Sequence, residues 1–216
     1  MKKLFFLMTA SLCIVASSCS FHEQSETKIE SETKKSGERE TNIGVKPYKE
    51  PLSQVGEEAK HPLGTFMLKQ LSEPNATITA GPLQIQIERV KIVQSTQEIS
   101  EIGIYNLKER GLSTEQMNAI QFTAILENSS EQDIDLNNGS FKTLLLSNGE
   151  EVDVSKMSAD PKKQTLKAKQ KMPFTLICFL TQAPNDIKSV KVITDVVKDP
   201  QTRNELNSST TTEITM

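Results

Sequence analysis

The chain has 216 residues, enough for one domain with tails, and its formal net charge at pH 7 is −3. Aromatic residues make up 5% of it, with no Trp, two Tyr and eight Phe, which excludes a protein that stacks sugars on aromatic side chains. Residues 62–216 contain sixteen Lys or Arg and nineteen Asp or Glu, a balance that argues against nucleic-acid binding.

Residues 1–18 have the pattern of an export signal. Lys2 and Lys3 precede a mostly apolar stretch that is too short to cross a bilayer, which takes about 20 residues. Small residues then lead to Cys19, and this ending resembles the lipobox of bacterial lipoproteins, although Ala16 stands where Leu is usual. The resemblance implies cleavage before Cys19 and diacylation of its thiol, and two acyl chains would anchor the protein at the extracytoplasmic face of the cell membrane. A plain secretory signal cut nearby is the alternative.

Polar composition predicts disorder on both sides of one folded domain. Residues 19–62 are rich in Glu, Lys, Ser and Thr with scattered aliphatic residues, and residues 199–216 are polar and rich in Ser and Thr. Neither segment offers enough apolar area to offset the entropy lost on ordering. We therefore expect a disordered tether, a folded domain over residues 63–198 and a disordered tail.

Apolar residues alternate with a period of two through the predicted domain, which indicates β-strands. The expected strands cover residues 77–79, 83–92, 120–126, 141–146, 152–154, 174–180 and 190–196. A phase shift near Glu88 and Arg89 suggests a bulge, and Asn148-Gly149 between two strands is a hairpin signal. About seven short antiparallel strands predict an all-β fold, an immunoglobulin-like β-sandwich.

Residues 97–118 break this alternation. Ile99, Ile102 and Tyr105 have helical spacing, and Ser113 begins a sequence that resembles a capping box. We expect a long loop with one or two short helical turns. Long loops on a sandwich often carry function, and an insertion that only closes one end of the sandwich is the alternative.

Three segments resemble a known domain family: residues 76–92, 121–130 and 141–150. They are similar to the immunoglobulin-like domain of unknown function found in many Gram-positive surface lipoproteins, which is akin to secreted mycobacterial immunoprotective antigens. The resemblance covers roughly residues 76–197. It implies a β-sandwich with an extracytoplasmic binding or accessory role, and it supplies no active-site residues.

The predicted domain lacks the residues of common catalytic sites. Both histidines, His22 and His61, fall in the predicted tether, so we expect no Ser-His-Asp triad, Cys-His pair or typical zinc site. Cys178 lies in an apolar run and is predicted to be a buried hydrophobic residue rather than a nucleophile. We therefore expect no enzymatic activity and no cofactor.

One acidic segment has part of a calcium-binding pattern. Asp133, Asp135 and Asn137 follow the EF-hand spacing, but Asn138 and Leu144 stand where that loop needs Gly and Glu. We interpret the segment as a polar turn that runs into an edge strand.

A group of lysines is the most distinct charge feature: Lys162, Lys163, Lys167, Lys169 and Lys171. The last three alternate, so a strand would point them to one side, where they would meet anionic wall polymer or lipid headgroups. The alternative is a solvated edge strand whose lysines block aggregation.

The sequence thus predicts a membrane-anchored extracytoplasmic lipoprotein whose domain is a binding or accessory module for an envelope protein or wall polymer. Such a module should show an apolar surface patch or a cleft among its loops. A lipoprotein that binds a small solute is the alternative, and it should enclose a pocket between its sheets.

Overall fold

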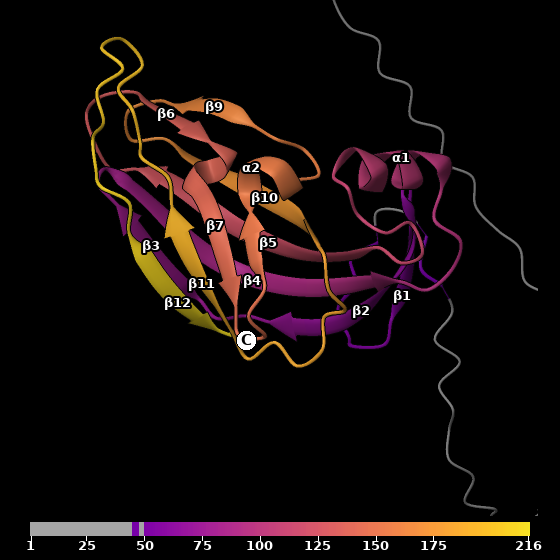
Figure 1. The fold of residues 1–216 in the computed structure, drawn as a ribbon. Helices are drawn as coiled ribbons and strands as arrows, with labels where there is room; N and C mark the ends of the chain where they lie inside the picture. Colours follow the sequence, from indigo (N-terminus) through magenta and orange to yellow (C-terminus); the bar gives the residue numbers. More distant parts are fainter. Residues whose placement is uncertain (1–44, 48–49) are drawn as a thin grey trace, which may run out of the picture. The chain divides into compact units, whose positions relative to one another are not determined.

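The computed structural model describes residues 45–47 and 50–216. The predicted signal, Cys19, His22 and the first part of the predicted tether lie outside the described residues. Within them the fold is all-β, and every pairing between named strands is antiparallel (Figure 1). No helix of this part of the chain is long and apolar enough to cross a membrane.

The elements run along the chain in the following order. The strands are β1 Glu58–His61, β2 Gly64–Ser72, β3 Ala76–Ala80, β4 Leu83–Ser95, β5 Asn118–Asn128, β6 Ile134–Asn137, β7 Phe141–Leu146, β8 Glu151–Asp153, β9 Lys163–Leu166, β10 Lys171–Leu180, β11 Ser189–Thr194 and β12 Thr211–Thr215. The helices are α1 Glu101–Glu109, α2 Val154–Met157 and a 3-10 turn, Asn138–Ser140.

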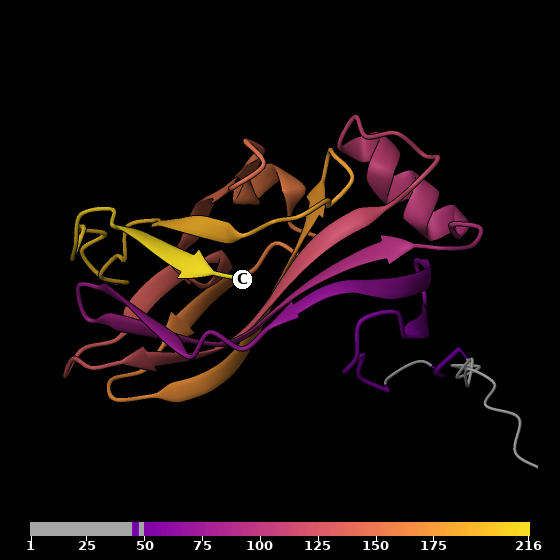
Figure 2. The same ribbon diagram turned by 90° about the horizontal axis from the view of Figure 1, so that it is seen from below.

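These strands form a large sheet and two smaller ones. The large sheet has the order β1-β2-β4-β5-β10, and β3 also pairs with β4. The second sheet has the order β12-β11-β7-β8, and β6 pairs with β9 in a third. Figures 1 and 2 show the long strands of the large sheet curling, with α1 and β1 at one end of it and β3 and β12 at the other.

The main core lies between the large sheet and the second sheet. Alternate residues of β4, β5 and β10, such as Ile85, Phe122 and Leu176, pack against Leu144 and Val192 of the second sheet. Because side chains of a strand alternate between its two faces, all three strands use one face for this core. We call it the sealed face of the large sheet. Each large aliphatic or aromatic side chain buried there contributes about 1.5–3 kcal/mol.

Three phenylalanine rings fill the middle of this core. The ring centroids of Phe122 and Phe141 are 5.4 Å apart, and those of Phe141 and Phe174 are 6.2 Å apart. Gly139 lies directly against them, with φ at +63°, and a Cβ atom on it would sit 2.5 Å from the Phe174 ring. Only glycine fits here, because both the backbone conformation and the space exclude a side chain.

Several sequence predictions are confirmed. The chain is all-β, the register of β4 against β5 shifts between Ile87 and Arg89, and Asn148-Gly149 turns the hairpin between β7 and β8. A helix, α1, lies within residues 97–118. The immunoglobulin-like arrangement is not confirmed. Twelve strands in three sheets occupy the described residues, and β1, β2, β6, β9 and β12 were not among those expected.

The predicted domain boundaries are wrong at both ends. Residues 58–61 of the predicted tether form β1, and Lys46 pairs with Ala59 in a further bridge. Residues 211–215 of the predicted tail form β12, where Ile214 is 1% exposed and pairs with Val190. Composition missed both strands because main-chain pairing and one or two buried side chains hold each of them.

The predicted capping box at Ser113 is also wrong. The N-cap of α1 is Ser100, whose Oγ accepts a hydrogen bond of 3.1 Å from the N–H of Gly103. Ser113 lies beyond the helix, and its Oγ accepts from the N–H of Glu115 in a local turn.

Candidate functional site

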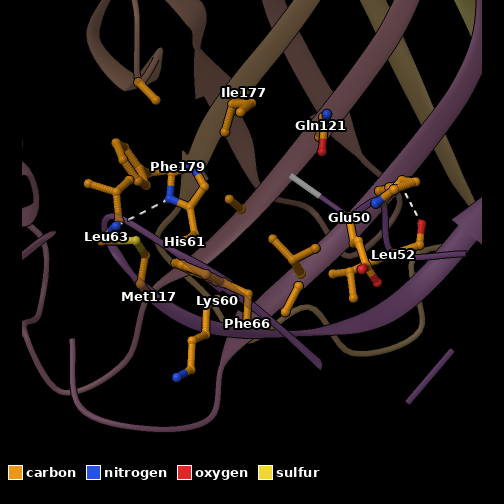
Figure 3. A pocket seen from close by; sticks show the side chains of 16 residues that line it. Glu50, Leu52, Lys60, His61, Leu63, Phe66, Met117, Gln121, Ile177 and Phe179 are labelled. Atoms are coloured by element: carbon orange, nitrogen blue, oxygen red, sulfur yellow. Dashed lines mark hydrogen bonds between the residues drawn. The ribbon is translucent and has the colours of Figure 1, made fainter. Parts of the chain in front are cut away.

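A concave pocket of about 290 Å³ lies on the other face of the large sheet (Figure 3). Its floor comes from β2, β4, β5 and β10 through Phe66, Val93, Ala119, Ile177 and Phe179. These residues alternate with those of the sealed face, so they point away from the main core. We call this the pocket face.

Helix α1 packs behind one wall of the pocket, and none of its own residues lines the cavity. Ile99, Leu107 and Met117 pack with Phe66 and Phe179 in a cluster separate from the main core. Met117 and Leu63 line the pocket itself, as Figure 3 shows. The apolar spacing within residues 97–118 therefore serves to cover part of the pocket face.

Hydrogen bonds fix the start of α1 to the turn between β1 and β2. Ser100 donates from its N–H to the carbonyl of Leu63 (3.1 Å) and from Oγ to that of Pro62 (2.7 Å). Gly103 faces the same turn, where a Cβ would lie 2.5 Å from the Leu63 carbonyl oxygen. The glycine thus permits the close approach of helix and turn that closes this side of the pocket.

Arg110 fixes the other end of α1. Its guanidinium carbon lies 4.9 Å from the centroid of the Phe179 ring, a cation–π contact. Its Nη2 donates to the carbonyl of Ser158 (2.7 Å), and its Nη1 donates to that of Asn106 (2.9 Å). One arginine thus joins the helix, the pocket floor and the segment before β9.

The opposite wall consists of β1 and residues 50–52, held by a carboxylate. Oε2 of Glu57 accepts hydrogen bonds from Nζ of Lys46 (2.8 Å), the N–H of Ser53 (2.7 Å) and that of Gln54 (3.1 Å). The bond from Lys46 contributes most to lowering the pKa of Glu57 to about 2, and the backbone donors add to it. This clamp positions Leu52, which packs on Ala59 and Leu68.

Lys91 is the buried charged residue of the pocket. It lies on β4, lines the pocket with 7% of its surface exposed, and donates from Nζ to the carbonyl of Leu52. Burial lowers its pKa below the usual value, and the positive charge of Arg89 lowers it further. The ammonium group therefore lies at the wall of an otherwise mainly apolar cavity.

His61 lies on β1 in the same pocket, and its ring is visible in Figure 3. Nδ1 accepts a hydrogen bond of 3.2 Å from the N–H of Leu63, and the ring meets Phe66 edge-on at 5.9 Å. Partial burial of the ring lowers the pKa of His61 from its usual value, which favours the neutral form. Sequence reasoning placed His61 in a disordered tether and missed this position.

Cys178 is a buried hydrophobic residue, as predicted. It has no exposed surface and packs in the main core. Burial raises the pKa of its thiol to about 12, so the group stays protonated at neutral pH. It lies on the sealed face, away from the pocket.

The structure does not bring the predicted lysines together on one strand face. Lys167 and Lys169 lie in the turn between β9 and β10, so their expected alternation along a strand is wrong. Four of the five are paired with acids: Lys162 with Asp160 at 3.3 Å, and Lys167, Lys169 and Lys171 at 2.8 Å with Asp133, Glu131 and Glu127. Lys163 lies on β9, opposite Asn137. Local acids thus neutralise most of this cluster.

Protein donors also occupy the acidic residues of the partial calcium pattern. Asp133 accepts from Nζ of Lys167 (2.8 Å), and Asp135 accepts from Arg203 and Thr165 (both 2.6 Å). In the part of the chain that the structure describes, no group of three or more acidic, His or Cys side chains is placed to hold a metal ion. The interpretation as a polar turn fits this geometry.

No protein-family model matches the chain, and no curated protein matches it either. Among solved structures, it is similar to "a functionally unknown protein from Listeria monocytogenes EGD-e", with 17% sequence identity and a TM-score of 0.48. The alignment covers 71% of this chain and 88% of that one. This similarity carries no argument about function, and the resemblance to immunoglobulin-like lipoprotein domains stays a prediction.

Proposed function

We propose that the protein is a membrane-anchored extracytoplasmic lipoprotein whose β domain is a binding module. Its pocket face receives an apolar group of an envelope partner. The observation that carries the proposal is the pocket itself: an apolar floor on the large sheet, between two walls that are each fixed by hydrogen bonds. The anchor rests on the lipobox-like sequence that ends at Cys19.

The energetics of the pocket favour binding. Its floor leaves apolar surface uncovered, and covering such surface contributes about 25 cal/mol per Å². Protein interfaces gain most of their affinity from a few large side chains that enter well-packed pockets. Because the walls are already in place, a partner would bind without ordering them first.

The location of the pocket supports a binding module more than a solute-binding protein. A binding module should show an apolar surface patch or a cleft among its loops, and the lining of this pocket includes residues 50–52 before β1 and Met117 after α1. A solute-binding protein should enclose a pocket between its sheets, and here phenylalanine rings fill the middle of that space. The paired lysines of residues 162–171 give less support to a wall polymer as the partner.

Crosslinking in intact cells tests the proposal. Gln121 lines the pocket, whereas Thr123, two residues along β5, points to the same face and lies outside it. We expect Gln121→Trp to fill the pocket and abolish crosslinking to a specific envelope protein. The matched variant Thr123→Trp should crosslink like the unchanged protein. Equal recovery of the same protein with both variants would show that the pocket is not the binding site.

One observation favours a second candidate, the binding of a small ligand. The pocket holds the buried ammonium of Lys91, which an apolar partner group would leave without a counter-charge. At about 290 Å³, the pocket lies near the lower limit of small-molecule sites, roughly 300–1,000 Å³.

A further inference from the structure

Lys91 is an unusual residue for the pocket face. Lysine is almost never fully buried unless its charge is paired, yet Lys91 is 7% exposed. Val93 follows on the same face of β4, and Leu52, whose carbonyl accepts from Lys91, also lines the pocket. An apolar residue at position 91 would make the pocket wall apolar throughout. The presence of a buried charge there therefore calls for a physical explanation.

The hydrogen-bonding capacity of Lys91 is only partly used. An ammonium group can donate three hydrogen bonds, and within the described residues Lys91 donates one, to the carbonyl of Leu52. The charge of the clamp carboxylate, Glu57, acts on Lys91, but its hydrogen bonds come from Lys46 and two backbone donors. Lys91 therefore keeps donor capacity at the pocket wall.

The charges around the pocket favour an anion. Lys60 and Lys91 are its basic lining residues, Glu50 is acidic and exposed, and partial burial lowers the pKa of His61, which favours its neutral form. A buried charge without full pairing is costly, so a ligand carboxylate beside Nζ of Lys91 would relieve that cost. Hydrogen bonds between two charged groups are roughly twice as strong as neutral ones.

We infer that the pocket binds a small amphiphilic carboxylate, with its apolar chain on the floor of the pocket and its carboxylate on Nζ of Lys91. Phe66, Val93 and Ile177 would contact the chain. The volume of the pocket selects a short chain, since it lies near the lower limit of small-molecule sites. This inference rests on the second candidate function, the binding of a small ligand at the pocket, and specifies the chemistry of that ligand.

Calorimetric titration with decanoate and decanol tests the inference. The chain carries Cys19→Ser, so that no acyl chain competes, and both probes are kept below the concentrations at which they aggregate. We expect decanoate to bind at least about tenfold more tightly than decanol, because a hydrogen bond to a charged group contributes about 1.5–3 kcal/mol. Lys91→Met should remove this preference, weakening decanoate about tenfold and leaving decanol within about twofold.

Lys60→Met is the matched control, since Lys60 is an exposed lysine of the same pocket. It should change the affinity for decanoate by less than about threefold. Equal binding of decanoate and decanol, or an equal loss with Lys60→Met and Lys91→Met, would overturn the role of Lys91 and leave the pocket as a site for apolar groups. If neither probe bound, the inference would be overturned together with small-ligand binding at the pocket, whereas the crosslinking experiment separately decides whether a protein partner uses the pocket.

Discussion

The two faces of the large sheet are both apolar, but they are covered in different ways. On the sealed face, residues such as Phe122 and Leu176 pack against a second sheet and have almost no exposed surface. On the pocket face, helix α1 packs over part of Phe66 and Phe179, and the segment held by Glu57 lies on the other side. The cavity remains on the floor that neither of these two segments covers. A sheet can match a sheet along its whole length, whereas a nine-residue helix cannot, so the pocket remains where the cover ends.

The largest expected difference between the faces concerns neighbouring residues of β10. Leu176→Ala removes a buried side chain from the sealed face and should lower the free energy of unfolding by about 2–5 kcal/mol. Ile177→Ala removes a partly exposed side chain from the pocket floor and should cost about 1–2 kcal/mol. Urea unfolding of both variants measures this difference, and equal costs would mean that the pocket face is packed as fully as the core.

A second comparison isolates close packing from backbone strain. Gly139 and Gly111 have φ values of +63° and +68°, but a Cβ would meet the Phe174 ring only at Gly139. Gly111→Ala should cost about 1 kcal/mol from strain alone. Gly139→Ala should cost about 1–3 kcal/mol more, because the ring is held within the core. Thermal unfolding of both variants measures the difference, which should disappear if the core can yield around Phe174.

The clamp on the pocket wall should make stability depend on pH. The pKa of Glu57 is lowered from 4.5 to about 2 in the folded protein, so its stabilisation is complete above pH 4.5 and is lost as pH falls towards 2. Glu57→Gln should therefore lower Tm by several degrees near neutral pH and by little at pH 2. Melting curves across this range test the prediction. Glu58→Gln, at the following residue and the first of β1, is the control. An equal effect of Glu57→Gln and Glu58→Gln on Tm would argue against a specific clamp.

The smallest expected effect concerns the predicted lysine surface. Lys171 is exposed and pairs with Glu127 on the neighbouring strand β5. Exposed ion pairs contribute about 0–1 kcal/mol, so Lys171→Met should change the free energy of unfolding by less than about 1 kcal/mol. Urea unfolding measures it. A larger loss of unfolding free energy would mean that the ion pair between Lys171 and Glu127 stabilises the fold as strongly as a core residue does.

The sequence predicted the elements whose pattern is local. Alternation located β4, β5, β7 and β10, the phase shift near Arg89 located the bulge, and Asn148-Gly149 located the hairpin. It missed β1 and β12, because main-chain pairing with β2 and β11, rather than a long run of alternating apolar residues, holds these short strands in place. It also placed Lys167 and Lys169 in a strand, although Asp133 and Ser130 hold them in a turn.

The pocket could not be located from the sequence, although one signal of a second apolar face was present. In β10, Phe174, Leu176 and Cys178 point to one face, while Ile177 and Phe179 are apolar as well and point to the other. A strand that is apolar on both sides needs cover on both sides. What covers the second side depends on how α1 and residues 50–57 fold back, and no local pattern specifies that arrangement.

The most direct test of the pocket as a binding site is amide chemical-shift mapping by NMR with decanol, a neutral apolar probe. We predict saturable shifts at Ala119, Gln121 and Ile177, and small shifts at residues of the main core such as Val192. The Gln121→Trp variant should lose these shifts, and Thr123→Trp should keep them. Shifts centred on another surface, or none that saturate, would contradict the claim that the pocket face binds apolar groups.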